Sequence, residues 1–355
     1  MTLGTPAAER LPVTIITGFL GAGKTTLLNH LIRQPELSTA AVIINEFGAI
    51  SLDHELVEKT DGDIVEVKGG CLCCTVRGDL VQALHDLLLK RQKGDVRKFD
   101  RVIIETTGLA DPAPILHTFM ADPLAYDKFR LDGIVTVVDA VNGAATLDAH
   151  EEAFKQAAIA DRLLVSKADL ADPAPLIERL TSLNPGARII PVSNGKLAPA
   201  EILNIGPFDP KAKGDDVEDW LRAEAAHHHH HHHHDVNRHD AHIRAFTYTR
   251  EAPVQIDSLQ FLLQLLATMR GPDLLRVKGI INVADQPNTP AVIHGVQHVF
   301  HPVTWLKAWP SADRRTRLVF IVRDITEEQI ADLMESLDDA DVADATAVAR
   351  GEKQA

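Results

Sequence analysis

The segment GFLGAGKT at residues 18–25 constrains the fold more than any other feature of this sequence. It directly follows the apolar stretch VTIIT (13–17) and leads into TTLLNHLIR (25–33), where leucines recur at helical spacing. A G-x-x-x-x-G-K-T pattern between a strand and a helix is typical of a phosphate-binding loop. The sequence therefore predicts a P-loop, in which backbone N–H groups at a helix N-terminus cradle phosphates and glycines allow a close approach.

The residues expected to bind nucleotide in this loop lie in the motif or directly beside it. They are Gly18, Gly21, Ala22, Gly23, Lys24, Thr25 and Thr26. Lys24 is expected to reach the β- and γ-phosphates, and the Thr25 hydroxyl is expected to bind Mg²⁺. Both are predicted to be catalytic, because phosphoryl transfer depends mainly on positioning and charge neutralisation.

Short apolar stretches alternate with helix-like stretches through the first two hundred residues. The apolar stretches lie at 13–17, 41–45, 63–67, 101–107, 133–140, 162–169 and 187–193. Strands that are apolar throughout and separated by helices indicate a mostly parallel sheet covered on both faces. We predict an α/β P-loop NTPase domain over residues 12–208, after an N-terminal tail of residues 1–11.

A second, smaller domain is predicted over residues 241–340, followed by a tail at 341–355. The polar segment 209–240 between the two domains has the composition of a flexible linker. The second domain begins with a strand-like stretch and a leucine-rich helix, followed by a hairpin-like pair of strands around ADQPNTP. Another strand at 316–322 and an acidic helix complete a β-α-β-β-β-α order. This order predicts an α+β domain with an antiparallel sheet backed by helices.

The stretch SKAD, which contains Ser166, Lys167 and Asp169, resembles the N-K-x-D element that reads guanine in GTPases. The Asp169 carboxylate can accept hydrogen bonds from guanine N1–H and the 2-amino group. Adenine has no amino group at that position, so this pair of hydrogen bonds would be lost at a substantial cost in binding free energy. All three residues are predicted nucleotide ligands, and guanine is favoured over adenine.

The stretch VIIETTGLADP supplies a third element, because Glu105 ends an apolar strand and Gly108 follows three residues later. A carboxylate at that strand end can hold the Mg²⁺ shell or position water, so Glu105 is a predicted catalytic residue. The Gly108 N–H can sense a γ-phosphate. Asp139, at the end of the next strand, is assigned no role.

All three cysteines of the chain, Cys71, Cys73 and Cys74, lie within four positions of the stretch GGCLCC. Thiolates are soft ligands that suit Zn²⁺, Cu⁺ and, less selectively, Co²⁺. Two or three sulfurs leave a tetrahedral site incomplete, which suits reversible transfer better than a structural role. We therefore expect a metal site, with a redox pair or buried small side chains as the alternatives.

Eight consecutive histidines lie within the predicted linker. They are His227, His228, His229, His230, His231, His232, His233 and His234. Their imidazoles are mostly neutral near pH 7 and can bind Zn²⁺, Ni²⁺ or Co²⁺. We expect them to act as auxiliary metal ligands, and the alternative is a low-complexity spacer with incidental metal affinity.

The charge balance is acidic, with 36 Lys+Arg against 50 Asp+Glu and a formal net charge of -14. This balance disfavours nucleic acid and anionic membrane surfaces as partners. The N-terminus lacks the charged and apolar regions of a secretory signal, and the leucine-rich helix is too short to span a bilayer. We expect a cytoplasmic protein.

The stretches GFLGAGKT, INEFG (44–48), GGCLCC, ETTGLADP, SKAD and LLRVKGIINV…GVQHVF, taken in order, resemble the CobW-like family of metal-chaperone GTPases. The resemblance covers residues 12–208 and 241–323. It implies a GTPase domain of the SIMIBI class, a CobW C-terminal domain, slow GTP hydrolysis and a metal held by the C-x-C-C cysteines.

The resemblance further implies that residues 45–48 belong to switch I and residues 105–108 to switch II. Glu46, within the first of these segments, is a weaker candidate as a metal ligand or a water-positioning residue. Metal affinity at the cysteines would then depend on whether GTP or GDP is bound.

The function we expect from the sequence is a GTPase that binds Mg²⁺-GTP, holds Zn²⁺ at the cysteines and delivers it to a client metalloprotein. A nucleotide- or metal-dependent dimer is compatible with this function. Three alternatives stay open: cobalt handling for cobalamin synthesis, a small-molecule kinase, and a passive zinc store. Affinity order alone favours Zn²⁺ over Co²⁺.

Overall fold

A computed structural model of the chain describes residues 9–47, 64–69, 75–205, 243–269, 273–301 and 303–336. The chain divides into two compact units, whose described elements end at residue 205 and begin again at residue 243. The cysteine motif, the predicted linker with its histidine run, and most of both predicted tails lie outside the described residues.

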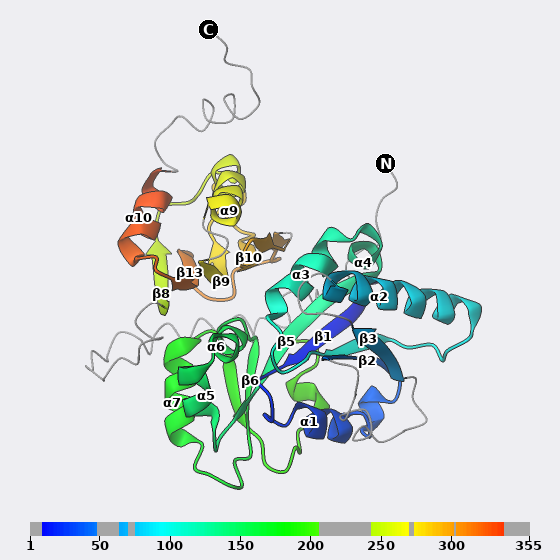
Figure 1. The fold of residues 1–355 in the computed structure, drawn as a ribbon. Helices are drawn as coiled ribbons and strands as arrows, with labels where there is room; N and C mark the ends of the chain where they lie inside the picture. Colours follow the sequence, from blue (N-terminus) through cyan, green and yellow to red (C-terminus); the bar gives the residue numbers. More distant parts are fainter. Residues whose placement is uncertain are drawn as a thin grey trace. The chain divides into compact units, whose positions relative to one another are not determined.

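The first unit is built on one parallel sheet of seven described strands (Figure 1). These strands are β1 (Leu11–Thr17), β2 (Ala40–Phe47), β3 (Ile64–Gly69), β4 (Arg101–Glu105), β5 (Phe129–Asp139), β6 (Arg162–Ser166) and β7 (Arg188–Pro191). They lie in the order β3-β2-β4-β1-β5-β6-β7, and each neighbouring pair is parallel. The predicted parallel sheet is confirmed, with β1 between β4 and β5.

Helices cover both faces of this sheet. They are α1 (Lys24–Leu31), α2 (Thr75–Lys93), α3 (Pro112–Ala121), α4 (Pro123–Lys128), α5 (Gly143–Ala149), α6 (Glu151–Ala158) and α7 (Ala174–Leu183), with short 3₁₀ turns at Pro35–Leu37 and Pro199–Glu201. Figure 1 shows α1 on one side of the sheet and α2, α3 and α4 on the other. Leu27, Leu28 and Leu31 of α1 pack on strand residues such as Ile16 and Val137, so the predicted apolar face of α1 is in the core.

Two strands end earlier than the apolar pattern predicts. The stretch at 101–107 leaves the sheet after Glu105, because the Ala110 N–H donates to the Thr107 carbonyl and closes a turn. The stretch at 162–169 ends at Ser166, because Lys167 adopts a left-handed φ of 56°. At the ends of both strands the backbone leaves the sheet, at the edge where the residues of the predicted nucleotide site lie.

The second unit is a smaller α+β unit, as predicted. Its elements are β8 (Ile243–Arg250), α9 (Ile256–Met269), β9 (Leu274–Ile281), β10 (Ala291–Val296), β11 (Val299–Phe300), β12 (Thr304–Trp305), β13 (Thr316–Arg323) and α10 (Glu327–Ser336). The strands pair antiparallel in the order β11-β10-β9-β13-β8, with β12 beside β10. Leu262 and Leu266 of α9 and Met334 of α10 pack on sheet residues that include Phe320. The predicted hairpin is the β9–β10 pair.

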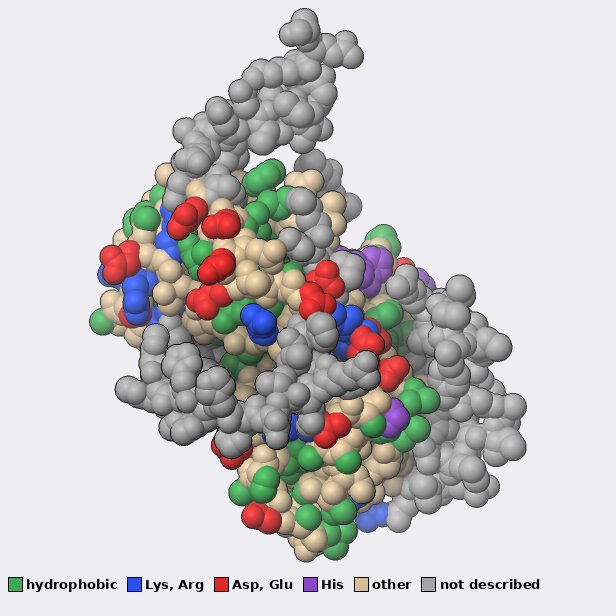
Figure 2. Space-filling model, turned by 60° about the vertical axis from the view of Figure 1, so that its left-hand side comes forward, with side chains coloured by type: hydrophobic (Ala, Val, Ile, Leu, Met, Phe, Trp, Pro, Cys, Tyr) green, Lys and Arg blue, Asp and Glu red, His purple; other side chains and the backbone are tan. Residues whose placement is uncertain are grey.

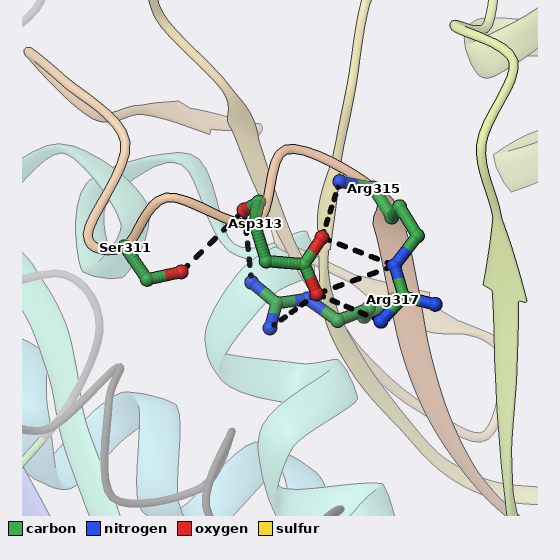
Figure 3. A network of polar contacts seen from close by, with 4 residues as sticks. All are labelled: Ser311, Asp313, Arg315 and Arg317. Carbon is green, nitrogen blue, oxygen red and sulfur yellow. Dashed lines mark hydrogen bonds and ion pairs between the residues drawn. The ribbon is translucent and has the colours of Figure 1, made fainter.

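A network of charged side chains lies at the start of β13 (Figure 3). The Asp313 carboxylate accepts hydrogen bonds from the Arg315 guanidinium, the shortest at 2.9 Å, and lies 3.4 Å from that of Arg317. The Arg315 side chain and N–H, together with Arg317, outweigh the opposing effect of burial and lower the pKa of Asp313 to about 2. This carboxylate is therefore ionised at neutral pH and joins the turn before β13 to the strand itself.

The surface carries both signs of charge. On the face drawn in Figure 2, the described acidic and basic side chains are interspersed, and Lys and Arg do not gather into a band. In neither unit do the described side chains on this face form a continuous basic surface of the kind that a phosphate backbone requires. Among the described residues, no helix has the length and apolar character needed to cross a bilayer.

Candidate nucleotide site

The P-loop lies between the end of β1 and the start of α1, as the motif predicts. Gly18 has a φ of 143°, and a Cβ on it would lie 2.3 Å from the Val137 carbonyl oxygen on β5. Gly23, just before α1, has a φ of 94°. Only glycine accommodates both requirements at Gly18, so the close packing of the loop on β5 explains the first glycine of the motif.

Lys24 folds back across the P-loop. Its ammonium group donates to the Gly18 carbonyl at 2.9 Å and to the Phe19 carbonyl at 3.2 Å. The side chain is buried, with 8% of its surface exposed, so the charge is held inside the loop rather than extended into solvent. The role predicted for Lys24 from the sequence, neutralisation of phosphate oxygens, stays a prediction.

Thr25 and Glu105 meet at the same edge of the sheet. The Thr25 hydroxyl donates to Glu105 Oε1 at 2.9 Å, and Glu105 is 5% exposed. Glu105 ends β4, whose register pairs it with Ile16 of β1. A hydroxyl and a carboxylate are the oxygen donors that Mg²⁺ prefers, so these two side chains fit a magnesium ion bound with the nucleotide.

The loop after β4 packs directly on the P-loop. A Cβ on Gly108 would lie 2.6 Å from the Leu20 backbone nitrogen, so a larger residue would push the two loops apart. Thr106 fixes the start of this loop, because its N–H donates to the Ile16 carbonyl at 2.9 Å and its hydroxyl donates to the Thr17 hydroxyl at 2.8 Å. Gly108 therefore lies beside the P-loop, where a γ-phosphate contact was predicted.

A cavity of about 220 Å³ lies on the other side of the P-loop. Its lining residues are Gly23, Thr26, Leu27, Val137, Leu164, Ser166, Lys167, Asp169, Leu170, Val192, Asn194 and Gly195. The structure thus brings the predicted base-reading residues together with the start of α1, and the cavity that they line is called the base cavity below. Asp169 is exposed, and its Oδ1 accepts from the Asn194 N–H at 3.1 Å, which orients the carboxylate.

Ser166 stands where related elements carry asparagine, and its hydroxyl contacts the P-loop. Its Oγ donates to the Ala22 carbonyl at 2.6 Å, and the Val138 carbonyl lies 3.3 Å away. Ser166 is 7% exposed, so this hydrogen bond is shielded from water. The serine therefore joins the base-reading segment to the phosphate-binding loop.

Asp139, which sequence reasoning left without a role, is the ion-pair partner of Lys167. Burial raises the pKa of Asp139, but hydrogen bonds from Lys167, Asn142 and the Val141 N–H outweigh this effect and the pKa is lowered. The pair fixes the Lys167 side chain beside the base cavity. The sequence indicated only that Asp139 ends an apolar strand, and its partner became visible when the structure placed β5 beside β6.

Other residues were missed for a different reason. Asn194 and Gly195 follow β7 in a turn that has left-handed φ values of 54° and 66°. They line the base cavity because β5, β6 and β7 are consecutive in the sheet, so the turn after β7 lies near the ends of the other two strands. The sequence SNG indicated a turn but gave no sign of this neighbourhood.

The predicted metal ligands are not tested by this geometry. Cys71, Cys73, Cys74 and the eight histidines lie outside the described residues, and Glu46 lies in β2 but its side chain is not described. Within the described ranges, no group of three or more His, Cys, Asp or Glu side chains is arranged to hold a metal ion. The cysteine motif lies between Gly69 of β3 and Thr75 of α2.

Each of the two units matches a known protein-family domain. Residues 12–191 match the CobW/HypB/UreG nucleotide-binding domain, and residues 243–338 match the cobalamin synthesis protein CobW C-terminal domain. The chain belongs to the CobW/HypB/UreG family. The predicted resemblance and both predicted domain types are confirmed, and the first unit is a P-loop GTPase domain.

Relatives within the CobW/HypB/UreG family share most of the chain. The zinc chaperone YjiA of Escherichia coli (strain K12) is 32% identical over 321 residues, which are 90% of this chain and 96% of that protein. The zinc-regulated GTPase metalloprotein activator 1 of Schizosaccharomyces pombe is 37% identical over 211 residues, 56% of this chain and 50% of that protein. The crystal structure of Zn(II)-bound YjiA GTPase from E. coli matches with a TM-score of 0.69 and 28% identity, over 92% of this chain and 99% of that chain.

Proposed function

We propose that this chain is a GTP-hydrolysing metallochaperone that binds zinc at the C-x-C-C motif in a nucleotide-dependent way and delivers it to a client metalloprotein. Cys71, Cys73 and Cys74 are the proposed zinc ligands. Glu46 is a candidate further ligand, and the histidine run 227–234 is an auxiliary one. The proposed GTPase domain spans residues 12–208, and the C-terminal domain spans 241–340.

One structural relationship carries this proposal. β3 pairs parallel with β2 and β2 with β4, so the carboxyl ends of these strands and of β1 share one edge of the sheet. Gly69, which ends β3 two residues before Cys71, is therefore at the same edge as Glu105 and the P-loop. A motif that starts at this edge is suited to sense the nucleotide, and the zinc-chaperone names of the relatives point to its cargo.

The proposed hydrolysis relies on side chains of the P-loop and of the end of β4. Lys24 neutralises charge on the β- and γ-phosphates, while Thr25 and Glu105 hold Mg²⁺ or its water shell. A bound Mg²⁺ bridges phosphate oxygens and offsets the charge that develops on them. Asp169 and Lys167 select and hold guanine. The cell compartment that we propose is the cytoplasm, and the client is a protein that requires zinc.

The test is zinc affinity measured by chelator competition on the chain lacking residues 227–234, with Mg²⁺-GTP, with Mg²⁺-GDP and without nucleotide. We expect at least about tenfold tighter binding with GTP, because a coupling free energy of 1–3 kcal/mol is typical between linked sites. Cys71→Ser/Cys73→Ser should abolish the tight binding.

Two outcomes separate the proposal from its competitors. Equal affinity in all three nucleotide states would show that the cysteines and the P-loop are not coupled, which leaves a passive zinc store. A Lys24→Ala variant is the matched control, because it should lose the difference between nucleotides while it keeps the three cysteines. Nucleotide-dependent binding that persists in Lys24→Ala would contradict coupling through the P-loop.

A further inference from the structure

α6 contacts both the P-loop and the loop that follows β4. His150, directly before α6, stacks on the Phe19 ring of the P-loop, with ring centroids 4.4 Å apart and planes at 25°. Lys155 lies with its ammonium group 4.0 Å from the Asp111 carboxylate, in the loop that follows β4. The next residue, Gln156, is hydrogen-bonded to that same loop. α6 therefore adds contacts between two loops that also pack on each other at Gly108 and Leu20.

Gln156 makes the most specific of these contacts. Its side chain is fully buried, and its amide nitrogen donates to the Gly108 carbonyl at 3.2 Å and the Ala110 carbonyl at 2.9 Å. Only the NH₂ group can donate to two carbonyls, so the orientation of the amide is fixed by its partners. The Gln156 backbone carbonyl in turn accepts from the Thr136 hydroxyl on β5 at 2.7 Å. The residue is thus anchored to the central sheet while it holds two carbonyls of the neighbouring loop.

The loop segment that Gln156 holds is a tight turn at residues 107–110. The Ala110 N–H donates to the Thr107 carbonyl at 3.2 Å and closes the turn. On its other side the turn touches the P-loop, since a Cβ on Gly108 would lie 2.6 Å from the Leu20 nitrogen. The turn is therefore held by Gln156 on one side and by the P-loop on the other.

The other half of the Gln156 amide indicates that packing alone does not account for this residue. Its Oε1 is buried and has no hydrogen-bond partner among the described residues. Gln156 lines a cavity of about 240 Å³ together with Phe19, Thr136 and Leu147. A buried acceptor without a partner is destabilising, so packing alone would favour an apolar side chain at this position. The two hydrogen bonds that the NH₂ group donates to the turn explain why an amide occupies this position.

We infer that Gln156 is a positioning residue for GTP hydrolysis, which holds the turn 107–110 against the P-loop so that the Gly108 backbone faces the γ-phosphate. This rests on the GTP hydrolysis of the proposed function and not on its zinc cargo. Loss of the two donors frees the turn to shift. A shift of about 1 Å in a positioning element slows a reaction by roughly a hundredfold.

The test is steady-state GTP hydrolysis by the full chain carrying Gln156→Met, in zinc-free buffer with Mg²⁺. Methionine has a similar length and no donor. We expect kcat to fall about tenfold or more, with KM for GTP within about twofold of the unsubstituted chain, because the lost interaction acts in the transition state. An unchanged kcat would overturn the inference.

Asn184 provides the matched control. It is also a fully buried amide, and its nitrogen donates at 3.0 Å each to the carbonyls of Ala157, Ala158 and Ala160, at and just beyond the other end of α6. Asn184→Leu should lower the melting temperature but leave kcat within about twofold at equal folded fraction, because no phosphate-facing loop is involved. If Asn184→Leu lowered kcat as much as Gln156→Met, destabilisation of α6 would explain both losses and the inference would be wrong.

A second variant, Gln156→Glu, tests the donor itself. A buried carboxyl has a raised pKa, and in its protonated form it regains one donor. The kcat of Gln156→Glu relative to the unsubstituted chain should therefore rise as the pH falls from about 8 to about 6. A ratio that does not change with pH would contradict the donor role. Absence of hydrolysis by the unsubstituted chain would refute the proposed function and this inference together, whereas equal hydrolysis by the unsubstituted chain and Gln156→Met refutes the inference alone.

Discussion

The Thr25 hydroxyl donates a 2.9 Å hydrogen bond to the Glu105 carboxylate, although the two residues are 80 positions apart in the chain. The contact exists because β4 lies beside β1 in the sheet, which brings the end of one strand to the helix that follows the other. It joins the oxygen donors that the proposed magnesium site requires, and it can be tested directly.

Glu105→Gln should raise the Mg²⁺ concentration that gives half-maximal GTP hydrolysis by about tenfold, because a neutral amide attracts the cation less strongly than a carboxylate. The measurement is a magnesium titration of the hydrolysis rate at saturating GTP. Glu152→Gln, at an exposed position on α6, removes the same charge and serves as the control. Equal magnesium requirements in the two variants would rule out a role for Glu105 near the ion.

Asp169→Asn should change which base the protein accepts. A carboxylate accepts from both guanine N1–H and the 2-amino group, whereas an amide donates one bond and accepts one, which suits the N1–H and C2 carbonyl of xanthine. We expect GTP affinity to fall by about a hundredfold and xanthosine triphosphate affinity to rise. Equilibrium binding of both nucleotides measures this change. Asp172→Asn, three residues later and bonded only locally to the Ala174 N–H, should keep the preference for guanine.

Asp139→Asn should weaken nucleotide binding without changing the chemical step. The substitution removes the charge that fixes Lys167 beside the base cavity. We expect KM for GTP to rise about tenfold with kcat unchanged, the pattern of a uniform binding contribution. Asp148→Asn breaks the comparable ion pair with Arg179 on α5 and α7 and should leave KM unaltered. A lower kcat in Asp139→Asn would instead place Asp139 in the reaction itself.

Asp313 should contribute to stability in a pH-dependent way. Its pKa is lowered from 3.8 to about 2, chiefly by Arg315, so its contribution is complete above pH 3.8 and is lost as the pH falls toward 2. Asp313→Asn should lower the free energy of unfolding at neutral pH by up to about 1 kcal/mol, and the deficit should shrink at acid pH. Urea unfolding at a series of pH values measures this. Asp332→Asn, at an exposed position on α10, removes the same charge outside this network and serves as the control.

The sequence predicted the parts of the molecule that depend on local pattern. The spacing of Gly18, Gly23 and Lys24 and the flanking strand and helix identified the P-loop, because these features lie in one continuous segment. The parallel sheet followed from strands that are apolar throughout. Strand ends were less accurate, since the turn at Thr107 and the left-handed Lys167 depend on hydrogen bonds and backbone angles that the apolar pattern does not encode.

The rest of the site depends on which strands are neighbours, and the sequence pattern does not give their order. Asp139, Gln156 and Asn194 come from three separate segments and act only because β5, α6 and β7 surround the P-loop and the base cavity. Each looked like an ordinary polar residue at a strand end, in a helix or in a turn. Their roles became visible only from contacts between residues far apart in the chain.

The all-parallel strand order also has a consequence for how the first unit is made. β1 ends at Thr17, but its nearest neighbour in the sheet, β4, begins only at Arg101 and its other neighbour, β5, at Phe129. At about 5–20 residues per second, a ribosome takes several seconds to synthesise the chain between them. Until β4 has been synthesised, β1 has neither of its sheet neighbours, and an unpaired apolar strand of this kind is prone to aggregation. In the antiparallel second unit, β9 pairs with β10 across a short connection, whereas β8 has to wait for β13, which begins only at Thr316.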